Sequence, residues 1–296
     1  MTNKIKKAII PVGGFGTRFL PATKATPKEM LTVVDKPIVQ MVVEEAYAAG
    51  IEQFIFITGR NKTILEDHFD KKPELEELLL KKNKIDLLKS INPEYLKSGS
   101  ISYIRQNEPN GLGHAVNCAK HFIGDEPFAV LLPDNIFLSE TPVMKQLTDS
   151  YTDGFLIGAY TVEPETVNRY GVFKTKNNDY SIGTVVQVDD IVQKPEVTKS
   201  PSNLVDAGRY IFTPDIFKAL EKEKFDSSGE IQLTDAITES IGKISVNGLI
   251  FQGEWFDCGN KNDYLRANIE FSLTRSDMKD KAIKILQQVN KKYNLI

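Results

Sequence analysis

Residues 8–30 read Ala-Ile-Ile-Pro-Val-Gly-Gly-Phe-Gly-Thr-Arg-Phe-Leu-Pro-Ala-Thr-Lys-Ala-Thr-Pro-Lys-Glu-Met, and this stretch decides the fold. The apolar run at 8–10 stops at a proline, which predicts a short buried strand of a parallel sheet. Glycines follow at once as Gly13, Gly14 and Gly16. Glycine tolerates positive φ and lets backbone N–H groups approach an anion closely. The stretch therefore predicts a strand that leads into a phosphate-binding loop.

Two cations, Arg18 and Lys28, lie within the same short segment and favour the polyphosphate of a nucleotide as the ligand. A dinucleotide-binding fingerprint, G-x-G-x-x-G, fails because Phe19 stands where its third glycine is needed. The G-x-x-x-x-G-K-[ST] pattern of a P-loop does not occur in the chain. A plain glycine turn between strand and helix explains the glycines but not Arg18, Pro27 and Lys28, so an anion site is the better interpretation.

The composition is that of an ordinary globular protein, with 296 residues, 41% of them hydrophobic and 26% charged. A net charge of −3 argues against a nucleic-acid-binding scaffold and favours a small partner. We expect no membrane association and a cytoplasmic location, because the sequence has neither an apolar run of about 18 residues nor a signal-peptide pattern. Cys118 and Cys258 are far apart, which fits reduced thiols better than a disulfide or a metal cluster.

Helix and strand patterns alternate after the glycine loop. Residues 36–49 carry apolar side chains at helical spacing before Gly50, residues 54–59 form an aromatic and β-branched run, and a second helical pattern begins at Asn61. Such alternation predicts an α/β fold in which crossover helices join parallel strands and ligands bind beyond the carboxyl ends of the strands. The charge-rich stretch at 71–97 predicts an inserted amphipathic helix with a solvated face.

Two later segments place polar groups where a nucleotide could bind. The turn at 106–114 is polar, contains glycine and opens a helix, so a base can sit there. The strand pattern at 128–134 ends in Asp134, whose carboxylate would face the ligand crevice. A Mg²⁺ ion that bridges phosphate oxygens needs one or two carboxylates, so Asp134 is a metal-ligand candidate, with a capping role as the alternative. His114 has no evident nucleophile or metal partner, and we assign it no chemistry.

The second half of the chain is rich in strand patterns, and no linker or internal repeat separates it from the first half. We therefore expect one domain over residues 1–296. Within it we expect a nucleotide-binding part at about 1–150, a β-rich part at about 151–260 that carries the other half of the site, and helices at about 261–296. The lysine-rich tail from Arg275 predicts a surface or subunit-contact helix rather than a nucleic-acid arm.

Several strings resemble the signature of sugar-1-phosphate nucleotidylyltransferases, and the similarity extends from Lys7 to about Glu270. The strings are Gly14-x-Gly16-Thr17-Arg18, Leu20-Pro21-Ala22-Thr23-Lys24, Pro27-Lys28-Glu29-Met30-Leu31, Gly111-Leu112-Gly113-His114-Ala115-Val116 and Gly229-Glu230-Ile231-Gln232-Leu233-Thr234-Asp235-Ala236-Ile237. The resemblance implies a Rossmann-like three-layer nucleotidyltransferase fold, with a mixed, mostly parallel central sheet, a β-rich sugar-binding subregion and C-terminal helices. It also implies an enzyme that transfers uridylyl from UTP to glucose 1-phosphate, releases pyrophosphate, and forms a homo-oligomer, either a dimer or a tetramer.

The resemblance also implies roles for individual residues. Arg18 and Lys28 would hold the triphosphate, Mg²⁺ on Asp134 would neutralise charge at the reacting centre, and Lys194 would hold the sugar phosphate, so these four are the catalytic candidates. Asp257, in a late Asp-x-Gly segment, is the second metal candidate. The residues implied to bind the nucleotide are Gly13, Gly14, Gly16, Thr17, Arg18, Lys28, Gln106 and Gly111, the last two at the uracil ring. The residues implied to bind the sugar are Gly171, Gln193, Lys194 and Gly208.

The chain departs from the family pattern at two positions. Gln193 stands where the resembled enzymes carry a glutamate that binds glucose hydroxyls, and Gly13 stands where alanine is usual. The change at Gly13 should be mild, because glycine keeps the backbone donor. Gln193 leaves open a related enzyme that uses another hexose phosphate, or a thymidine or adenine nucleotide. A non-catalytic sugar-nucleotide-binding protein is the alternative from another class, and a nicotinamide-dependent dehydrogenase is a more distant one.

Overall fold

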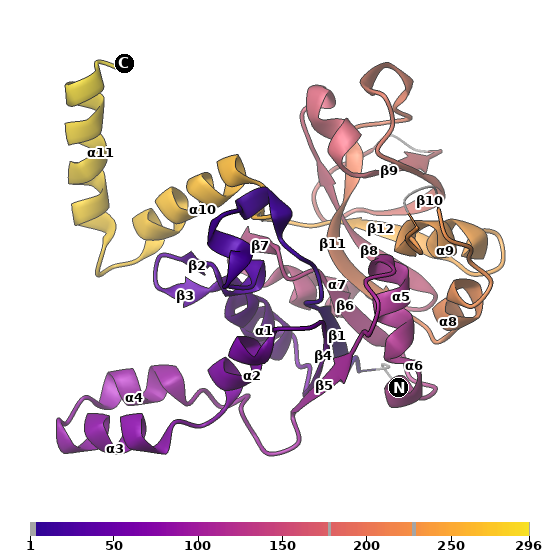
Figure 1. The fold of residues 1–296 in the computed structure, drawn as a ribbon. Helices are drawn as coiled ribbons and strands as arrows, with labels where there is room; N and C mark the ends of the chain where they lie inside the picture. Colours follow the sequence, from indigo (N-terminus) through magenta and orange to yellow (C-terminus); the bar gives the residue numbers. More distant parts are fainter. Residues whose placement is uncertain (1–3, 177–178, 227–228, 296) are drawn as a thin grey trace.

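The centre of the molecule is one large β-sheet, seen in a computed structural model that describes residues 4–176, 179–226 and 229–295 (Figure 1). Its strands lie in the order β5 (Ile101–Arg105), β4 (Gln53–Thr58), β1 (Lys7–Pro11), β6 (Phe128–Leu131), β11 (Leu204–Phe212), β8 (Phe155–Thr161), β12 (Val246–Ile250), β10 (Val185–Gln193) and β9 (Gly171–Thr175).

The first half of this sheet is parallel. β1 pairs with β4 on one side and with β6 on the other, and β4 pairs in turn with β5. The chain thus builds outward from β1 in one direction and then returns to the other side of β1 with β6. In open α/β sheets, ligands bind beyond the carboxyl ends of the strands where the strand order reverses in this way. The loops after β1 and β6 therefore meet at the expected ligand edge.

The second half of the sheet is mixed. β11 runs antiparallel to β6 and β8, and β10 runs antiparallel to β12 and β9, whereas β12 and β8 are parallel. The prediction of a mixed sheet is confirmed, but parallel pairing dominates only from β5 to β6. For β9 and β10 the connection is the reason, because the described residues between them form no crossover helix, which a parallel pair would need.

The sheet separates two hydrophobic clusters, which gives the three layers that were predicted. Along β1, Ala8 and Ile10 belong to one cluster and Ile9 to the other, as in a strand buried on both faces. The helices that contribute to the first cluster are α1 (Ile38–Ala48), α2 (Thr63–Phe69) and α7 (Val143–Ser150), together with Ala267 of α10 (Lys261–Thr274). Those of the second are α5 (Gly111–Cys118), α6 (Lys120–Ile123), α8 (Asp215–Leu220) and α9 (Leu233–Ser240).

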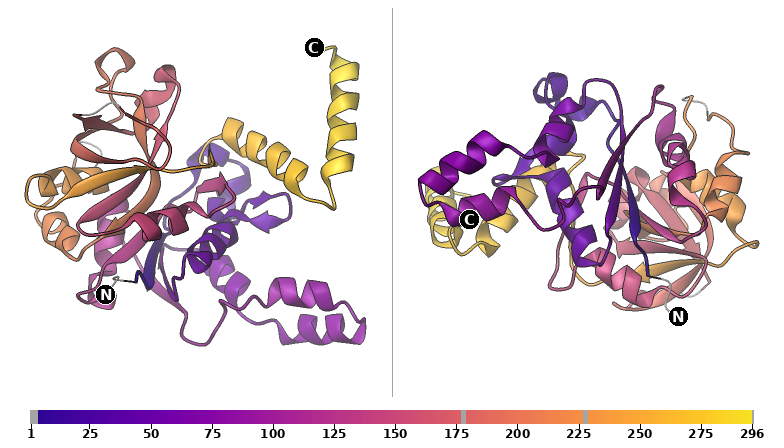
Figure 2. Two further views of the ribbon diagram at one scale, coloured as in Figure 1. Left: turned by 180° about the vertical axis from the view of Figure 1, so that it is seen from behind. Right: turned by 90° about the horizontal axis from the view of Figure 1, so that it is seen from below.

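The remaining elements lie around this core. They are the pairs β13 (Glu254–Asp257) with β7 (Asn135–Leu138) and β2 (Thr32–Val33) with β3 (Lys36–Pro37), and the helices α3 (Pro73–Lys81), α4 (Ile85–Ile91), α10 (Lys261–Thr274) and α11 (Lys279–Tyr293). The charge-rich insertion is helical, as predicted, although it forms two helices and not one. Both α3–α4 and α11 project away from the central sheet (Figures 1 and 2). Among the described residues, no helix has the length and apolarity that a membrane span requires.

Candidate active site

The glycine loop after β1 folds back against Lys28. Gly16 has a φ of +66°, and a Cβ atom built on it would lie 3.0 Å from Lys28 Cβ, so only glycine fits this turn without strain. Thr23 Oγ1 donates a hydrogen bond to Gly16 O at 2.7 Å and closes the turn. Arg18 lies in the short 3₁₀ helix η1 (Thr17–Phe19), where its side chain is exposed. The loop therefore presents one exposed cation, Arg18, whose Nη1 donates to Gly259 O at 3.4 Å, and holds a second one, Lys28, against its backbone.

Lys28 and Asp134 form an ion pair across the ligand edge. Lys28 Nζ lies 2.6 Å from Asp134 Oδ2, and both side chains are about four-fifths buried. Burial opposes charge on both groups, but their mutual attraction prevails, so the pKa of Lys28 is raised and that of Asp134 is lowered. Both groups are consequently charged at neutral pH. The loops after β1 and β6 do meet, and they bring a fixed cation and a fixed carboxylate together.

Asp257 lies beside Asp134, as a pair of metal ligands requires. β13 pairs with β7 so that Asp257 stands opposite Asn135, and a Cβ atom built on Gly259 would lie 3.0 Å from Asp134 Oδ2 and 2.8 Å from Asp257 Oδ1. Burial raises the pKa of Asp257 and the charge of Asp134 raises it further, while Arg169, at 2.9 Å, opposes the rise. In the described part of the chain, no group of three or more acidic, His or Cys side chains could hold a metal. A metal here would need oxygens from the substrates as well.

A buried ion pair between Lys62 and Glu29 lies behind the loop and was not predicted from the sequence. Lys62 Nζ donates to Gly14 O at 2.8 Å and lies 3.0 Å from Glu29 Oε2. The side chains of Lys62 and Glu29 are only 8% and 0% exposed. Burial raises the pKa of Glu29, and the cations of Lys62 and Lys28 oppose this rise. The pair ties the backbone of the glycine loop to the segment that carries Lys28, and no sequence pattern indicated it.

A second buried cation clamps the loop that carries Asp134. Arg209 is fully buried on β11 and donates to Leu132 O at 3.0 Å and to Asn135 O at 2.7 Å, one on each side of Asp134 in the sequence. Its guanidinium also pairs with Glu45 at 2.7 Å. A buried arginine keeps its charge and needs such partners. Arg209 therefore positions Asp134 through the backbone, which the sequence analysis did not anticipate.

Gln106 and Gly111 lie together at the predicted base-binding turn. Gln106 Nε2 donates to Gly111 O at 3.1 Å and lies 2.9 Å from His114 Nδ1, which therefore accepts. Gln106 Oε1 points towards the glycine loop, 3.1 Å from where a Cβ atom of Gly13 would be. Helix α5 begins at Gly111, earlier in the turn than expected, and Gly111 has a φ of +94°. His114, to which we assigned no chemistry, orients the Gln106 amide.

A polar pocket of about 210 Å³ joins the two halves of the predicted site. Lys194 begins the turn after β10 with a φ of +46°, a left-handed backbone that residues with a side chain rarely adopt. Its N–H donates to Tyr170 O at 2.9 Å, which holds the turn in place. The predicted residues that line the pocket are Arg18, Asp134, Asp257, Gly171, Gln193, Lys194 and Gly208. Gly13, Gly14, Gly16, Thr17, Lys28, Gln106 and Gly111 do not line it; they belong to the adjoining loop and turn.

The comparison with known protein families matches residues 7–272 to the model described as "Nucleotidyl transferase". The chain belongs to the nucleotidyl transferase family. Within that family it is 46% identical over 295 residues to the UTP–glucose-1-phosphate uridylyltransferase YngB of Bacillus subtilis, covering 99% of this chain and 98% of the relative. It is 47% identical over 289 residues to the UTP–glucose-1-phosphate uridylyltransferase of Staphylococcus haemolyticus, covering 97% and 99%.

Solved structures of family members share the fold over nearly the whole chain. The UTP-bound UGPase from Acinetobacter baumannii superposes with a TM-score of 0.88 at 39% identity, covering 96% of this chain and 99% of that one. A UDP-glucose pyrophosphorylase complexed with UDP-glucose superposes with a TM-score of 0.83 at 40% identity, covering 92% and 100%. The nucleotidyltransferase fold predicted from the sequence is confirmed.

Proposed function

We propose that the chain is a UTP–glucose-1-phosphate uridylyltransferase, which makes UDP-glucose and pyrophosphate. The observation that carries this proposal is the pocket of about 210 Å³, which has Arg18, Asp134 and Asp257 on one side and Lys194 on the other. One cation, Arg18, thus lies beside a pair of carboxylates, and a second, Lys194, lies across the pocket from them, so that two phosphate groups could bind between the two halves of the sheet. The two relatives described above, which match nearly the full chain, are UTP–glucose-1-phosphate uridylyltransferases, which supports the same conclusion.

The nucleotide would bind across the glycine loop. Backbone N–H groups at Gly13 and Gly14, together with Arg18 and Lys28, would neutralise the triphosphate. Lys28 keeps its charge at neutral pH because its pKa is raised, so the contact does not depend on proton uptake. The uracil ring would lie at Gln106, whose amide can donate and accept at once. Gln106 would then exchange its internal contacts for contacts with the base.

The pair Asp134 and Asp257 fits a magnesium ion. Mg²⁺ is usually held by one or two carboxylates together with waters and substrate phosphates. The carboxylates of Asp134 and Asp257 both lie against Gly259, and in the described part of the chain no third acidic, His or Cys side chain joins them as a metal ligand. Asp134 is ionised at neutral pH because the attraction of Lys28 outweighs its burial. When bound, the ion would neutralise charge on the phosphates that react.

The reaction needs no nucleophile from the protein. An oxygen of the sugar phosphate, largely dianionic at neutral pH since its second pKa is about 6, attacks the α-phosphorus of UTP. One P–O bond forms, the bond to the bridging oxygen of the β-phosphate breaks, and pyrophosphate leaves. Lys194 would hold the attacking phosphate in line, and Arg18 and Lys28 would stabilise the charge that develops on the transferred and leaving groups. Catalysis thus rests on positioning and on charge neutralisation.

The direct test is a matrix of four nucleoside triphosphates against several hexose 1-phosphates with Mg²⁺ and pyrophosphate release as the readout. We expect the highest kcat/KM for UTP with glucose 1-phosphate. A higher value with another sugar phosphate or with dTTP would overturn the substrate assignment while leaving a nucleotidylyltransferase. Binding of UDP-glucose without pyrophosphate release from any pair would instead indicate a non-catalytic binding protein.

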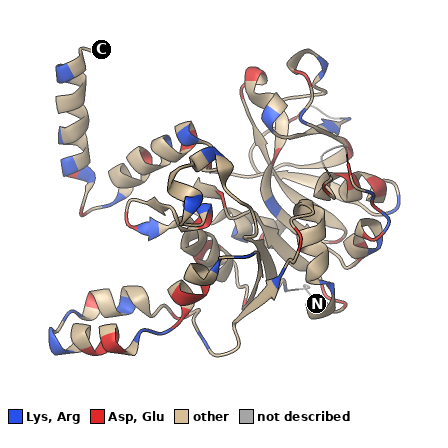
Figure 3. Ribbon diagram, viewed as in Figure 1, with Lys and Arg blue, Asp and Glu red and all other residues tan. Residues whose placement is uncertain are grey.

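We further propose that two copies of the chain associate through α11. This helix projects from the molecule, and among its described residues only Ala282 is buried (Figures 1 and 2). It carries lysines near both ends (Figure 3), in a chain whose net charge is −3. Exposed apolar residues at helical spacing form a stripe along it, namely Ile283, Leu286, Val289 and Tyr293. An unpaired stripe of this kind favours a protein partner.

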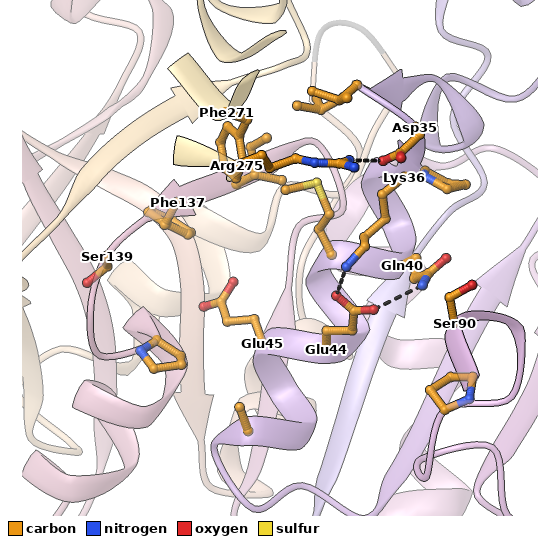
Figure 4. A pocket seen from close by; sticks show the side chains of 18 of the residues that line it. Asp35, Lys36, Gln40, Glu44, Glu45, Ser90, Phe137, Ser139, Phe271 and Arg275 are labelled. Carbon is orange, nitrogen blue, oxygen red and sulfur yellow. Dashed lines mark hydrogen bonds and ion pairs between the residues drawn. The ribbon is translucent and has the colours of Figure 1, made fainter. Parts of the chain in front are cut away.

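The surface that suits this helix lies beside α10 on the same chain. A groove of about 980 Å³ runs between α1, the β2–β3 turn and Arg275 (Figure 4), and its glutamates are paired within the chain, Glu44 with Lys36 and Glu45 with Arg209. Apolar lining residues such as Met41, Phe137 and Phe271 suit the apolar stripe of a second copy of α11. Leu286→Asp should then lower the mass measured by light scattering to that of the monomer, while Gln287→Asp should not. A monomeric wild-type protein would contradict the proposal.

The cytoplasmic location stays a prediction.

A further inference from the structure

Strand β11 places an additional carboxylate at the sugar side of the pocket. Where β11 pairs with β8, Asp206 lies opposite Ala159 and Tyr210 lies opposite Ile157. Between these two pairs β11 therefore has two more residues than β8, which is a bulge. Two extra residues leave the alternation of side chains unchanged, so Asp206 and Tyr210 are on the same face of β11, and both line the pocket of about 210 Å³. Bulges are frequent beside active sites. Neither residue was predicted from the sequence to belong to the site.

The Asp206 carboxylate is held in place but keeps hydrogen-bonding capacity. Oδ1 accepts from the backbone N–H of Gly208 at 2.7 Å, and Oδ2 accepts from the hydroxyl of Tyr210. A carboxylate offers about four acceptor sites, so each oxygen can accept one more hydrogen bond. The bulge that supplies these contacts requires Gly208, whose φ is +75° and where a Cβ atom would lie 2.4 Å from Asn135 Nδ2. The fold thus presents a pre-oriented acceptor.

Asp206 and Gln193 approach the pocket from opposite sides of Gly171. Gln193 pairs with Gly171 across β10 and β9, and Gln193 Oε1 lies 3.1 Å from where a Cβ atom of Gly171 would be. On the other side of β9, Val205 pairs with Val172, which brings the next residue, Asp206, beside Gly171. Because Gly171 has no side chain, an amide and a carboxylate can both reach a ligand above it. The carboxylate is on β11 and the amide on β10.

A second, independent observation points to a ligand with hydroxyl groups. Thr234 also lines the pocket, with its methyl group 3.4 Å from where a Cβ atom of Gly171 would be. Its hydroxyl is buried and, among the described residues, has no hydrogen-bond partner. Buried hydroxyl groups without a partner are unfavourable and call for an explanation, such as a missing ligand. A sugar hydroxyl in the pocket would supply that partner.

We propose that Asp206 accepts a hydrogen bond from a ring hydroxyl of the sugar 1-phosphate and determines which hexose the site prefers. This inference rests on the proposed function. In this chain the carboxylate that faces the sugar would come from β11, while Gln193 supplies a neutral contact on the opposite side. The ligand class is a hexose 1-phosphate, with Lys194 at its phosphate and Asp206 at a hydroxyl group of its ring.

The test compares Asp206→Asn with the wild-type enzyme. Hydrogen bonds to a charged acceptor are among the stronger ones, so we expect the KM for the sugar 1-phosphate to rise about 10- to 100-fold, with less than a twofold change in the KM for UTP. The series of 2-, 3-, 4- and 6-deoxyglucose 1-phosphates identifies the hydroxyl. With the analogue that lacks it, the two enzymes should have equal KM values. Asp189→Asn, on β10 and outside the pocket, is the matched control and should change neither KM.

A rescue variant separates binding from a purely structural role. Adding Gln193→Glu to Asp206→Asn returns one carboxylate to the pocket from the opposite side of Gly171. The KM of this double variant for the sugar 1-phosphate should be at least threefold lower than that of Asp206→Asn. An unchanged sugar KM in Asp206→Asn, equal losses in both KM values, or no difference between any deoxy analogue and glucose 1-phosphate would overturn the inference. If the wild-type chain releases no pyrophosphate from any substrate pair, the proposed function itself has failed.

Discussion

Replacing Lys62 by methionine tests whether the buried ion pair supports the glycine loop. Lys62→Met keeps the length and apolar stem of the side chain but removes the cation that binds Gly14 O and Glu29. Glu29 is completely buried and Lys62 almost so, and Glu29 Oε1 has no hydrogen-bond partner among the described residues. The variant therefore leaves a carboxylate in the interior with its nearest opposite charge gone.

The magnitude follows from the burial of the pair. Removing one partner of a buried ion pair typically destabilises a protein by about 3–5 kcal/mol, whereas an exposed pair contributes about 0–1 kcal/mol. At roughly 2 °C per kcal/mol for a chain of this size, Lys62→Met should lower Tm by about 6–10 °C. Lys6→Met is the matched control, because Lys6 and Glu52 form a largely exposed pair at 3.7 Å, and its Tm should change by no more than about 2 °C.

The pH dependence of the loss identifies Glu29 as its cause. Burial already raises the pKa of Glu29, and removing Lys62 takes away the largest effect that opposes this rise. A carboxyl group with a raised pKa in the folded state binds protons more tightly there than in the unfolded chain, so stability falls as pH increases through the folded-state pKa. The deficit of Lys62→Met should therefore be large at pH 8 and small at pH 5.

Chemical denaturation at both pH values measures this difference, and the double variant Glu29→Gln with Lys62→Met should recover most of it, since no charge is then left buried. A deficit that is the same at pH 5 and pH 8, or one that the double variant does not reduce, would refute the reasoning. Because Lys62 also binds the loop backbone, the KM for UTP should rise at pH 8 by more than the KM for the sugar phosphate.

Three further predictions concern the proposed reaction. Lys194→Ala should reduce kcat by about 30- to 1,000-fold, while the Kd for UTP from calorimetry stays within twofold, because Lys194 is assigned to the second substrate's phosphate; weaker UTP binding with normal turnover would contradict that role. Asp134→Asn should abolish the Mg²⁺-dependent rate without unfolding the chain, so a wild-type Mg²⁺ titration curve in this variant would remove Asp134 from the metal site. Burial raises the pKa of Asp206 to about 6, although the hydrogen bonds from Tyr210 and Gly208 lower it. Asp206 therefore binds a proton below pH 6, and the KM for the sugar phosphate should increase as the pH falls below that value. In Asp206→Asn, the KM measured over the same pH range reports only the titration of the substrate phosphate. If the KM of both proteins changes with pH in the same way, Asp206 is not the group whose protonation raises the KM.

The sequence was informative wherever function depends on a short local pattern. The strand at 8–10, the glycines after it and the carboxylate after β6 could all be placed from the sequence, because buried parallel strands are continuous apolar runs and ligands bind where such strands end. Gly16 needs positive φ, and only glycine adopts it readily, so a backbone requirement appears directly as a residue type. These features are decided within a few residues of one another.

Only the tertiary structure brought together the charges that surround those features. Glu29 and Lys62 are 33 residues apart and meet in the interior, and Asp206 and the neutral Gln193 reach one pocket through strand pairing, which a local pattern does not record. The bulge in β11 lets the backbone N–H of Gly208 and the hydroxyl of Tyr210 reach Asp206, and no short sequence pattern records such a bulge. The identity of a residue determines what charge it can carry. Its burial and its neighbours across the sheet determine whether that charge braces a loop or faces a substrate.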